Sequence, residues 1–252
     1  MERDYRAPRD FEPFVYVSQL LQAEGMRTAI EAQRRAKPSC MGSLYWQLND
    51  CWPAASWSSI DYAGDPKALH YFARDAFGEV LVSPVVEGNV LRVYAVSDRA
   101  AAIEGVAILT LLDFSGNVIW TDSRRVSMSA DSSVSFFESN VESLLRGRAR
   151  GAVVFSAELW ETDALLSKNL LYLAPPRELD LPPIEAALPG ERKSGSNLSV
   201  RSISRVDRGY SISLRARALV KNLYLSVEGH EGYFDRNFFD MLPGSRETVL
   251  FV

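Results

Sequence analysis

Four residues within one short stretch carry the side chains of a binding site. Trp46 lies inside an apolar run, and Asn49, Asp50 and Trp52 follow it closely. Their amide, carboxylate and indole groups can make hydrogen bonds, and the two indoles also present flat aromatic faces. Three of the chain's five tryptophans fall between Gly42 and Ser59. This stretch is therefore the first candidate for ligand recognition.

The residues around these side chains predict the elements that position them. The apolar run Met41 to Leu48 predicts a short strand, because turn-forming residues bound it on both sides. A helix is predicted on each side of the strand: from Phe11 to Lys37 after the cap Asp10, and from Pro66 to Phe77 after the cap Asp65. A strand followed by a polar and aromatic loop is how an α/β barrel places binding groups at the carboxyl ends of its strands.

A single strand between two helices is incomplete by itself. A barrel of this kind takes about 250 residues and eight strand and helix repeats, whereas residues 1–77 hold one strand. Buried backbone N–H and C=O groups are nearly always paired. We therefore expect other chain material to supply the neighbours of this strand.

After Gly78 the pattern changes to short, β-branched or alternating runs separated by turn residues. About seven strands fit between residues 80 and 175, with hairpin turns at 87–89 and 115–117, which is typical of an antiparallel sandwich. A proline-rich linker and a second, smaller sandwich follow. The fold class expected is mainly all-β, with two immunoglobulin-like sandwiches after a helix-strand-helix part of a barrel. The expected domains are 1–78, 79–176, the linker 177–192, and 193–252.

Charge and hydropathy limit the partners. The chain has 252 residues and a formal charge of −4, and no long basic run suggests binding to nucleic acid or to an anionic membrane surface. No stretch approaches eighteen apolar residues, and the charged start MERDYRAPRD is unlike a signal peptide. The expected protein is soluble, with no nucleic acid or membrane partner; it would be periplasmic or secreted if an upstream segment carried a signal.

Three segments resemble the β-mannosidases of glycoside hydrolase family 2. GSLYWQLNDCWPAASWSSIDYAGDPKALHYFARD is similar to the end of the catalytic barrel in that family, and DFEPFVYVSQLLQAEGMRTAIEAQRR is similar to the helix before it. FDRNFFDMLPGSRETVLFV resembles a motif near the C-terminus of the family. The resemblance implies that the chain corresponds to the last barrel unit and the two sandwiches that follow it.

The resemblance also implies an activity and a division of roles. The family hydrolyses terminal β-linked mannose with retention, and a β-mannoside oligosaccharide is therefore the expected substrate. The two glutamates of that mechanism have settings, Asn-Glu and Ser-Glu-Tyr/Phe-Gly, that do not occur in these residues. The expected partner is thus the N-terminal part of the same enzyme, and the chain alone is expected to be inactive. No cofactor or metal is implied. Trp46 is expected to be an aromatic platform for the mannose ring, and Asn49, Asp50 and Trp52 are expected to shape the same rim.

Other interpretations stay open at this point. Trp46 and Trp52 could pack between strand and helix, and Asp50 could brace the loop. A catalytic pair within the chain could come from one of two clusters of acidic residues. One cluster is Asp50, Asp61 and Asp65, and the other is Glu158, Glu161 and Asp163. The sandwiches could instead be a noncatalytic carbohydrate-binding or interaction module, with Tyr94, Trp120 and Trp160 as candidate contacts.

Overall fold

Two compact units make up the part of the chain that the structure describes. The computed structural model describes residues 1–182, 186–187 and 196–252. The first unit contains residues 1–46, 72–113 and 118–179, and the second contains 47–71, 114–117 and 180–252. Each unit thus joins part of the first 78 residues to one of the two β-rich regions.

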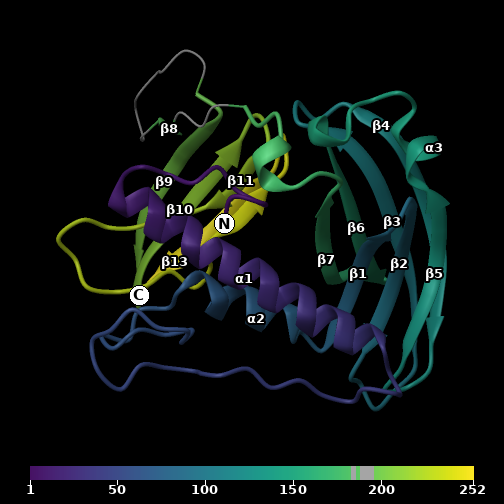
Figure 1. The fold of residues 1–252 in the computed structure, drawn as a ribbon, viewed down its shortest axis with the longest axis horizontal. Helices are drawn as coiled ribbons and strands as arrows, with labels where there is room; N and C mark the ends of the chain where they lie inside the picture. Colours follow the sequence, from purple (N-terminus) through teal and green to yellow (C-terminus); the bar gives the residue numbers. More distant parts are fainter. Residues whose placement is uncertain (183–185, 188–195) are drawn as a thin grey trace. The chain divides into compact units, whose positions relative to one another are not determined.

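Seven antiparallel strands form a two-layer sandwich in the first unit (Figure 1). One sheet has the order β1-β2-β5 and the other the order β4-β3-β6-β7. The seven predicted strands are confirmed, as is the mainly β, immunoglobulin-like fold class. Their bounds are β1 Val80–Glu87, β2 Val90–Ser97, β3 Ile103–Asp113, β4 Val118–Met128, β5 Ser133–Asn140, β6 Val153–Glu161 and β7 Ala164–Tyr172.

The hairpin turn between β1 and β2 shows how the sequence sets the pairing. Gly88 has a φ of 64°, a backbone conformation that glycine adopts without steric cost. Glu87 then pairs with Val90, and the register continues without interruption to Val80 opposite Ser97. The predicted turn at 87–89 is confirmed. A short helix, α3 Val141–Leu145, follows β5 and is capped by the side chain of Asn140.

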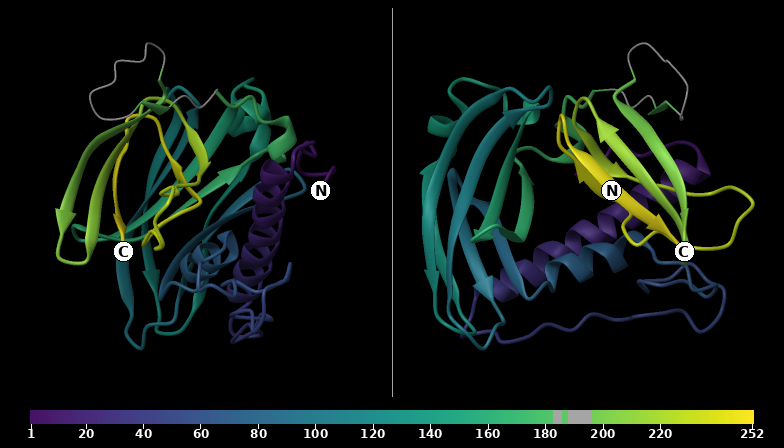
Figure 2. Two further views of the ribbon diagram at one scale, coloured as in Figure 1. Left: turned by 90° about the vertical axis from the view of Figure 1, so that its left-hand side faces the viewer. Right: turned by 180° about the vertical axis from the view of Figure 1, so that it is seen from behind.

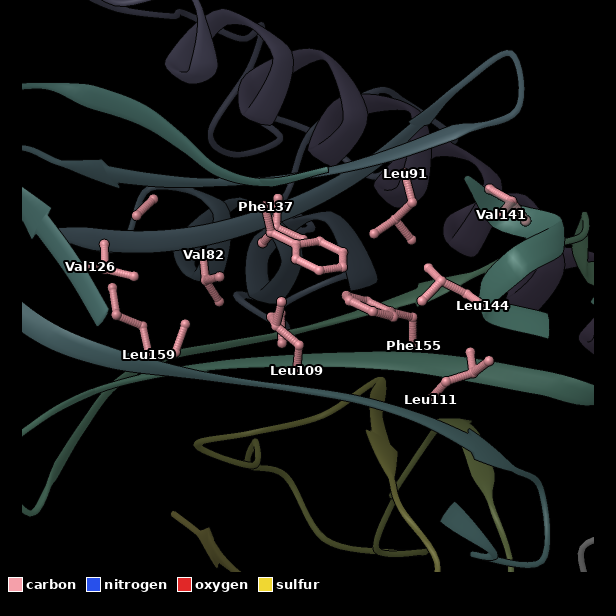
Figure 3. Packing of buried hydrophobic residues seen from close by; sticks show 14 of the residues in the cluster. Val82, Leu91, Leu109, Leu111, Val126, Phe137, Val141, Leu144, Phe155 and Leu159 are labelled. Atoms are coloured by element: carbon pink, nitrogen blue, oxygen red, sulfur yellow. The ribbon is translucent and has the colours of Figure 1, made fainter. Parts of the chain in front are cut away.

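The core of the first unit lies between its two sheets (Figure 3). Leu91 and Phe137 come from the β1-β2-β5 sheet, and Leu109 and Phe155 come from the facing sheet. Leu91, Leu109 and Phe155 are fully buried. Each such side chain stabilises the fold by roughly 2–3 kcal/mol through the area it removes from water.

Both predicted helices form, with small changes at their ends. The first, α1 Phe11–Arg35, begins where expected, and Asp10 occupies its N-cap position without a side-chain cap bond. The second, α2 Ala68–Ala76, starts two residues later than predicted, because Pro66 instead forms an antiparallel bridge with Ile60. None of the described helices combines the length and apolar character needed to cross a bilayer.

The predicted strand over residues 41–48 is wrong. This segment has no regular secondary structure, and the side chain of Leu44 is completely exposed. Regular strand structure requires a neighbouring strand that pairs with its backbone, and no described strand runs beside this segment. Only Asn49, just after it, makes an isolated parallel bridge, to Ile60. An apolar run without a partner therefore stays irregular and exposed.

A buried carboxylate joins α1 to the first sandwich. Glu31 accepts hydrogen bonds from Ser83 of β1 at 2.5 Å and from Asn169 of β7 at 3.0 Å. The guanidinium groups of Arg27 and Arg35 lie 4.0 and 3.7 Å from the same carboxylate. Because a buried charge needs both hydrogen bonds and an opposite charge, these contacts fix which face of α1 meets the sheet.

The second unit contains the smaller sandwich (Figure 2). Its sheets have the orders β13-β10-β9-β8 and β11-β12. The unit also includes the first turn of α2, where the Tyr71 hydroxyl donates to the Phe234 carbonyl at 2.7 Å. Leu214, Val220 and Val249 are fully buried in its core. The bounds are β8 Ala186–Ala187, β9 Leu198–Val206, β10 Gly209–Ala216, β11 Val220–Leu223, β12 Phe239–Met241 and β13 Arg246–Phe251.

The domain boundaries stay predictions. A short 3-10 helix, Pro176–Glu178, lies at the start of the predicted linker 177–192. Residues 183–185 and 188–195 lie outside the described residues, and they include most of the linker and the predicted start of the domain 193–252.

Truncating Phe155 tests the core of the first sandwich. Phe155→Ala should lower the free energy of unfolding by about 3–5 kcal/mol, because it removes a buried ring and leaves a cavity. Urea unfolding monitored by circular dichroism measures the change. Val118→Ala is the control, since Val118 is largely exposed and its truncation should change stability little; equal losses in both variants would contradict the assignment of this core.

Candidate functional site

Backbone hydrogen bonds fold the segment that carries the candidate residues into a compact loop. We call residues 47–67 the Asp50 loop. Ile60 N donates to Leu48 O at 2.8 Å, and Asp50 N donates to Ile60 O at 3.0 Å. Lys67 N closes the loop by donating to Ser59 O at 2.9 Å. These bonds satisfy backbone groups that a regular strand would have paired with a neighbour.

The carboxylate of Asp50 lies at the centre of this loop. Ser56 Oγ donates to one oxygen of the carboxylate, and Lys67 Nζ donates to the other at 3.0 Å. Lys67 Nζ also donates to Ser58 Oγ at 2.8 Å. The Asp50 side chain is only 5% exposed, so these contacts replace its hydration. Its carboxylate therefore braces the loop.

The same contacts determine the protonation of Asp50. The hydrogen bond from Ser56 is the largest effect and lowers the pKa of Asp50; burial opposes it, and the hydrogen bond from Lys67 adds to it. A carboxyl held ionised in this way accepts hydrogen bonds and does not donate a proton near neutral pH. The geometry thus favours a bracing role over general acid chemistry.

The other candidates in the loop are exposed. The Asn49 side chain donates to the Asp50 carbonyl at 3.1 Å. The Trp52 side chain is 66% exposed. The structure therefore places Asn49, Asp50 and Trp52 in one hydrogen-bonded loop, with Asp50 inside it and the other two at its surface.

Trp46 is the last residue of the first unit, and its side chain is 75% exposed. The alternative in which Trp46 and Trp52 pack between strand and helix is therefore wrong for the described structure. Both indoles have a face available to a ligand or to further protein.

Three residues of this arrangement were not predicted from sequence. The Asp50 carboxylate accepts hydrogen bonds from Ser56 and Lys67, and the hydroxyl of Ser58 is hydrogen-bonded to both of these residues. The two serines flank Trp57 in a polar stretch, and such stretches often form hydrogen-bonded turns. The sequence does not predict the ion pair between Lys67 and Asp50, because that pair depends on how the loop closes.

The alternative carboxylates make contacts of a structural kind. Asp61 accepts a hydrogen bond from the Asp65 backbone at 2.9 Å, as in a turn. Glu158 is paired with Lys168 at 2.9 Å, and Glu161 is paired with Arg99 at 3.1 Å. Within the described residues, no group of three or more His, Cys, Asp and Glu side chains is placed to hold a metal ion.

The aromatic candidates of a carbohydrate-binding sandwich are also engaged by the protein. Trp120 packs against Phe137 and Phe155, with ring centroids 5.5 and 6.4 Å apart. Tyr94 lies under the guanidinium of Arg35, 5.9 Å from its ring centre. These contacts favour packing roles for Trp120 and Tyr94.

Acidification tests the bracing role of Asp50. A lowered pKa in the folded state means that ionised Asp50 stabilises the fold above its ordinary pKa of 3.8, and that this contribution is lost as the pH falls through the lower folded value. Asp50→Asn should therefore be less stable than the wild type at neutral pH, with a difference that shrinks below pH 3.8. Urea unfolding across this range measures it.

Asp163→Asn is the matched control, because Asp163 is exposed in the turn between β6 and β7. At neutral pH that variant should be as stable as the wild type. An Asp50→Asn variant as stable as the wild type at neutral pH would contradict the role of Asp50.

Comparisons with known protein families and with individual proteins both find similarity to mannosidases. Residues 89–178 match the model of a "Mannosidase Ig/CBM-like domain", and residues 195–252 match that of an "Ig-fold domain". The chain is 30% identical to a β-mannosidase of the goat Capra hircus, covering 96% of this chain and 28% of the relative. A β-mannosidase A of Aspergillus niger is 29% identical, with coverage of 96% and 26%.

Solved structures agree with these relatives. The crystal structure of the β-D-mannosidase of Dictyoglomus thermophilum superimposes with a TM-score of 0.80 at 26% identity, covering 98% of this chain and 28% of that one. An exo-chitosanase of Amycolatopsis orientalis shares the fold, with a TM-score of 0.69 at 15% identity. The chain thus spans about a quarter of the length of its β-mannosidase relatives. By its domains and its relatives, the chain is similar to the C-terminal part of the β-mannosidases of glycoside hydrolase family 2.

Proposed function

We propose that this chain acts as the C-terminal part of a retaining exo-β-mannosidase, which removes terminal β-linked mannose from oligosaccharides or glycoconjugates. The observation that carries the proposal is that similarity to β-mannosidases extends over 96% of the chain, the Asp50 loop included. Retaining hydrolysis needs two carboxylates about 5 Å apart, one to protonate the leaving oxygen and one to attack the anomeric carbon. Both glutamates would belong to the N-terminal part of the enzyme.

The exposed apolar run from Met41 to Leu48 supports the N-terminal part of the enzyme as a protein partner. Met41 and Leu48 are more than half exposed, and Leu44 is completely exposed. Large exposed apolar side chains grouped in this way mark surfaces that another protein surface covers. Pairing with barrel strands of the N-terminal part would satisfy the backbone of this segment and bury these side chains together.

The candidate residues would then contribute recognition. Trp46 would stack its ring against the C–H face of the mannose ring. Asn49 and Trp52 would shape the rim of the subsite, and Asp50 would hold their loop. Each role fits the exposure of Trp46 and Trp52 and the buried, braced position of Asp50.

An assay of the chain alone tests the absence of catalytic groups. The 252-residue chain should not hydrolyse nitrophenyl β-mannoside, whereas the enzyme extended by its upstream coding sequence should. Release of nitrophenol measures both. Turnover by the chain alone that is abolished by Asp50→Ala would refute the proposal, since the acids would then lie within these residues.

A pair of tryptophan variants in the extended enzyme tests the platform. Trp46→Ala should lower kcat/KM by about tenfold or more, because stacking and subsite shape are lost; stacking contacts of this kind contribute about 0.5–1.5 kcal/mol beyond buried area. Trp57→Ala is the matched control, because Trp57 is an exposed tryptophan of the adjacent Asp50 loop that is assigned no sugar contact. Near-normal kinetics in Trp46→Ala would contradict the assignment.

Titration of the chain with mannan tests the alternative of a binding module. The packing of Trp120 and Tyr94 within the first sandwich leads us to expect no saturable binding in isothermal calorimetry. Saturable binding at micromolar concentration would instead favour a module that recognises carbohydrate by itself.

A further inference from the structure

Two buried cations lie at the C-terminal end of α1. Arg34 is 5% exposed and donates through Nη1 to the carbonyls of Ala76, at 2.6 Å, and Gly78, at 2.7 Å. These carbonyls lie at the C-terminal end of α2, where backbone acceptors lack helical partners. Arg34 thus caps α2 with a positive charge, which the helix dipole favours there.

Lys37 lies one turn beyond Arg34, and its side chain is 5% exposed. Its ammonium donates to the Ser97 carbonyl at 3.1 Å and to the carboxylates of Asp98 and Asp131. Burial acts to lower the pKa of Lys37, but the hydrogen bonds to Asp131 and Asp98 outweigh it and raise this pKa above its ordinary value. Three acceptors therefore satisfy all three N–H groups of a buried ammonium.

Asp98 connects the two cations. Its Oδ2 accepts from Arg34 Nη2 at 3.0 Å, and its Oδ1 accepts from Lys37. Asp98 directly follows β2, and its backbone N–H donates to the Glu79 carbonyl at 2.9 Å. The carboxylate is thus held by the sandwich, at the end where β2 leads into β3 and where α1 ends (Figure 1).

The second acceptor of Lys37 is held rigidly as well. Asp131, in the turn between β4 and β5, has a φ of 47° and donates its backbone N–H to the Arg99 carbonyl at 2.9 Å. A non-glycine residue with such a φ is uncommon and indicates that its surroundings fix its conformation. Charge-assisted hydrogen bonds are short and directional, so this cluster fixes the ends of α1 and α2 relative to one end of the sandwich.

The position of the cluster in the chain gives it a role in the proposed reaction. Trp46, the proposed platform for the mannose ring, lies in the segment that directly follows Lys37, where α1 has ended. We propose that Asp98 is a positioning residue for β-mannoside hydrolysis, which acts through Arg34 and Lys37 on the segment 38–46 of the same unit, where Trp46 lies. The proposal rests on the proposed function, and it gives the sandwich a part in catalysis although it supplies no atom to the reaction.

Kinetics normalised to active sites separate positioning from stability. In the extended enzyme, Asp98→Asn should lower kcat per site by about tenfold to a hundredfold, because displacement of a binding group by about 1 Å can cost that much even far from the reacting bond. Titration with a fluorinated glycosyl inactivator counts the active sites, so molecules that fail to fold do not enter kcat. Asp98→Glu, which keeps the charge, should retain most of the wild-type kcat.

Asp122→Asn is the matched control. Asp122 lies on β4 of the same sandwich and pairs with Arg124 at 2.7 Å, but it contacts neither helix end in the described structure. It should leave kcat per site unchanged. In the 252-residue chain itself, Asp98→Asn should speed hydrogen exchange over residues 68–76, and Asp122→Asn should not.

The outcomes divide as follows. Lower kcat per site and faster exchange in Asp98→Asn, with rescue by Asp98→Glu, support the positioning role. A lower melting temperature with unchanged kcat per site overturns it and leaves Asp98 as a stabilising residue only. A wild-type extended enzyme without β-mannosidase activity would refute the proposed function itself. The role of Asp98 in that reaction would then be refuted as well.

Discussion

Each strand of this protein depends on a neighbour that completes its backbone hydrogen bonds. The seven strands of the first sandwich find their neighbours within the unit, through hairpins such as the one at Gly88. The apolar run Met41 to Leu48 has no such neighbour among the described strands, and it remains irregular. The same constraint therefore accounts for a closed sandwich and for an irregular segment whose apolar side chains are exposed.

Buried charged side chains also position the helices and loops, and each of them is paired with a group of opposite charge. Asp50 is held by Lys67 inside the loop, and Glu31 joins α1 to the first sandwich. Arg34 and Lys37 share the carboxylate of Asp98. Removing one partner of such a pair leaves the other buried without compensation, which is costly. These contacts therefore determine where helices and loops lie more strictly than apolar packing would, because they have a direction.

Much of the fold followed from local pattern. The seven strands of the first sandwich, the hairpin turns and the long helix α1 were predicted correctly, because alternation, glycine turns and a broad apolar stripe are local signals. The strand over 41–48 was wrong, although its apolar pattern was strand-like, since pattern does not reveal whether a pairing partner is present. The bracing of Asp50 by Lys67 could not be read from the sequence, because the two residues meet only when the loop closes.

The sequence by itself determined the type and order of most elements, the location of the aromatic and polar residues, and the resemblance that led to the family. These are properties of neighbouring residues and of short motifs, which need no knowledge of contacts between distant segments. Only the tertiary structure decided that Asp50 is enclosed while Trp46 and Trp52 are exposed, and that Asp98 of the sandwich binds both Arg34 of α1 and Lys37 just after it. Such contacts join residues far apart in the chain, and their geometry exists only after the sheets and helices have packed.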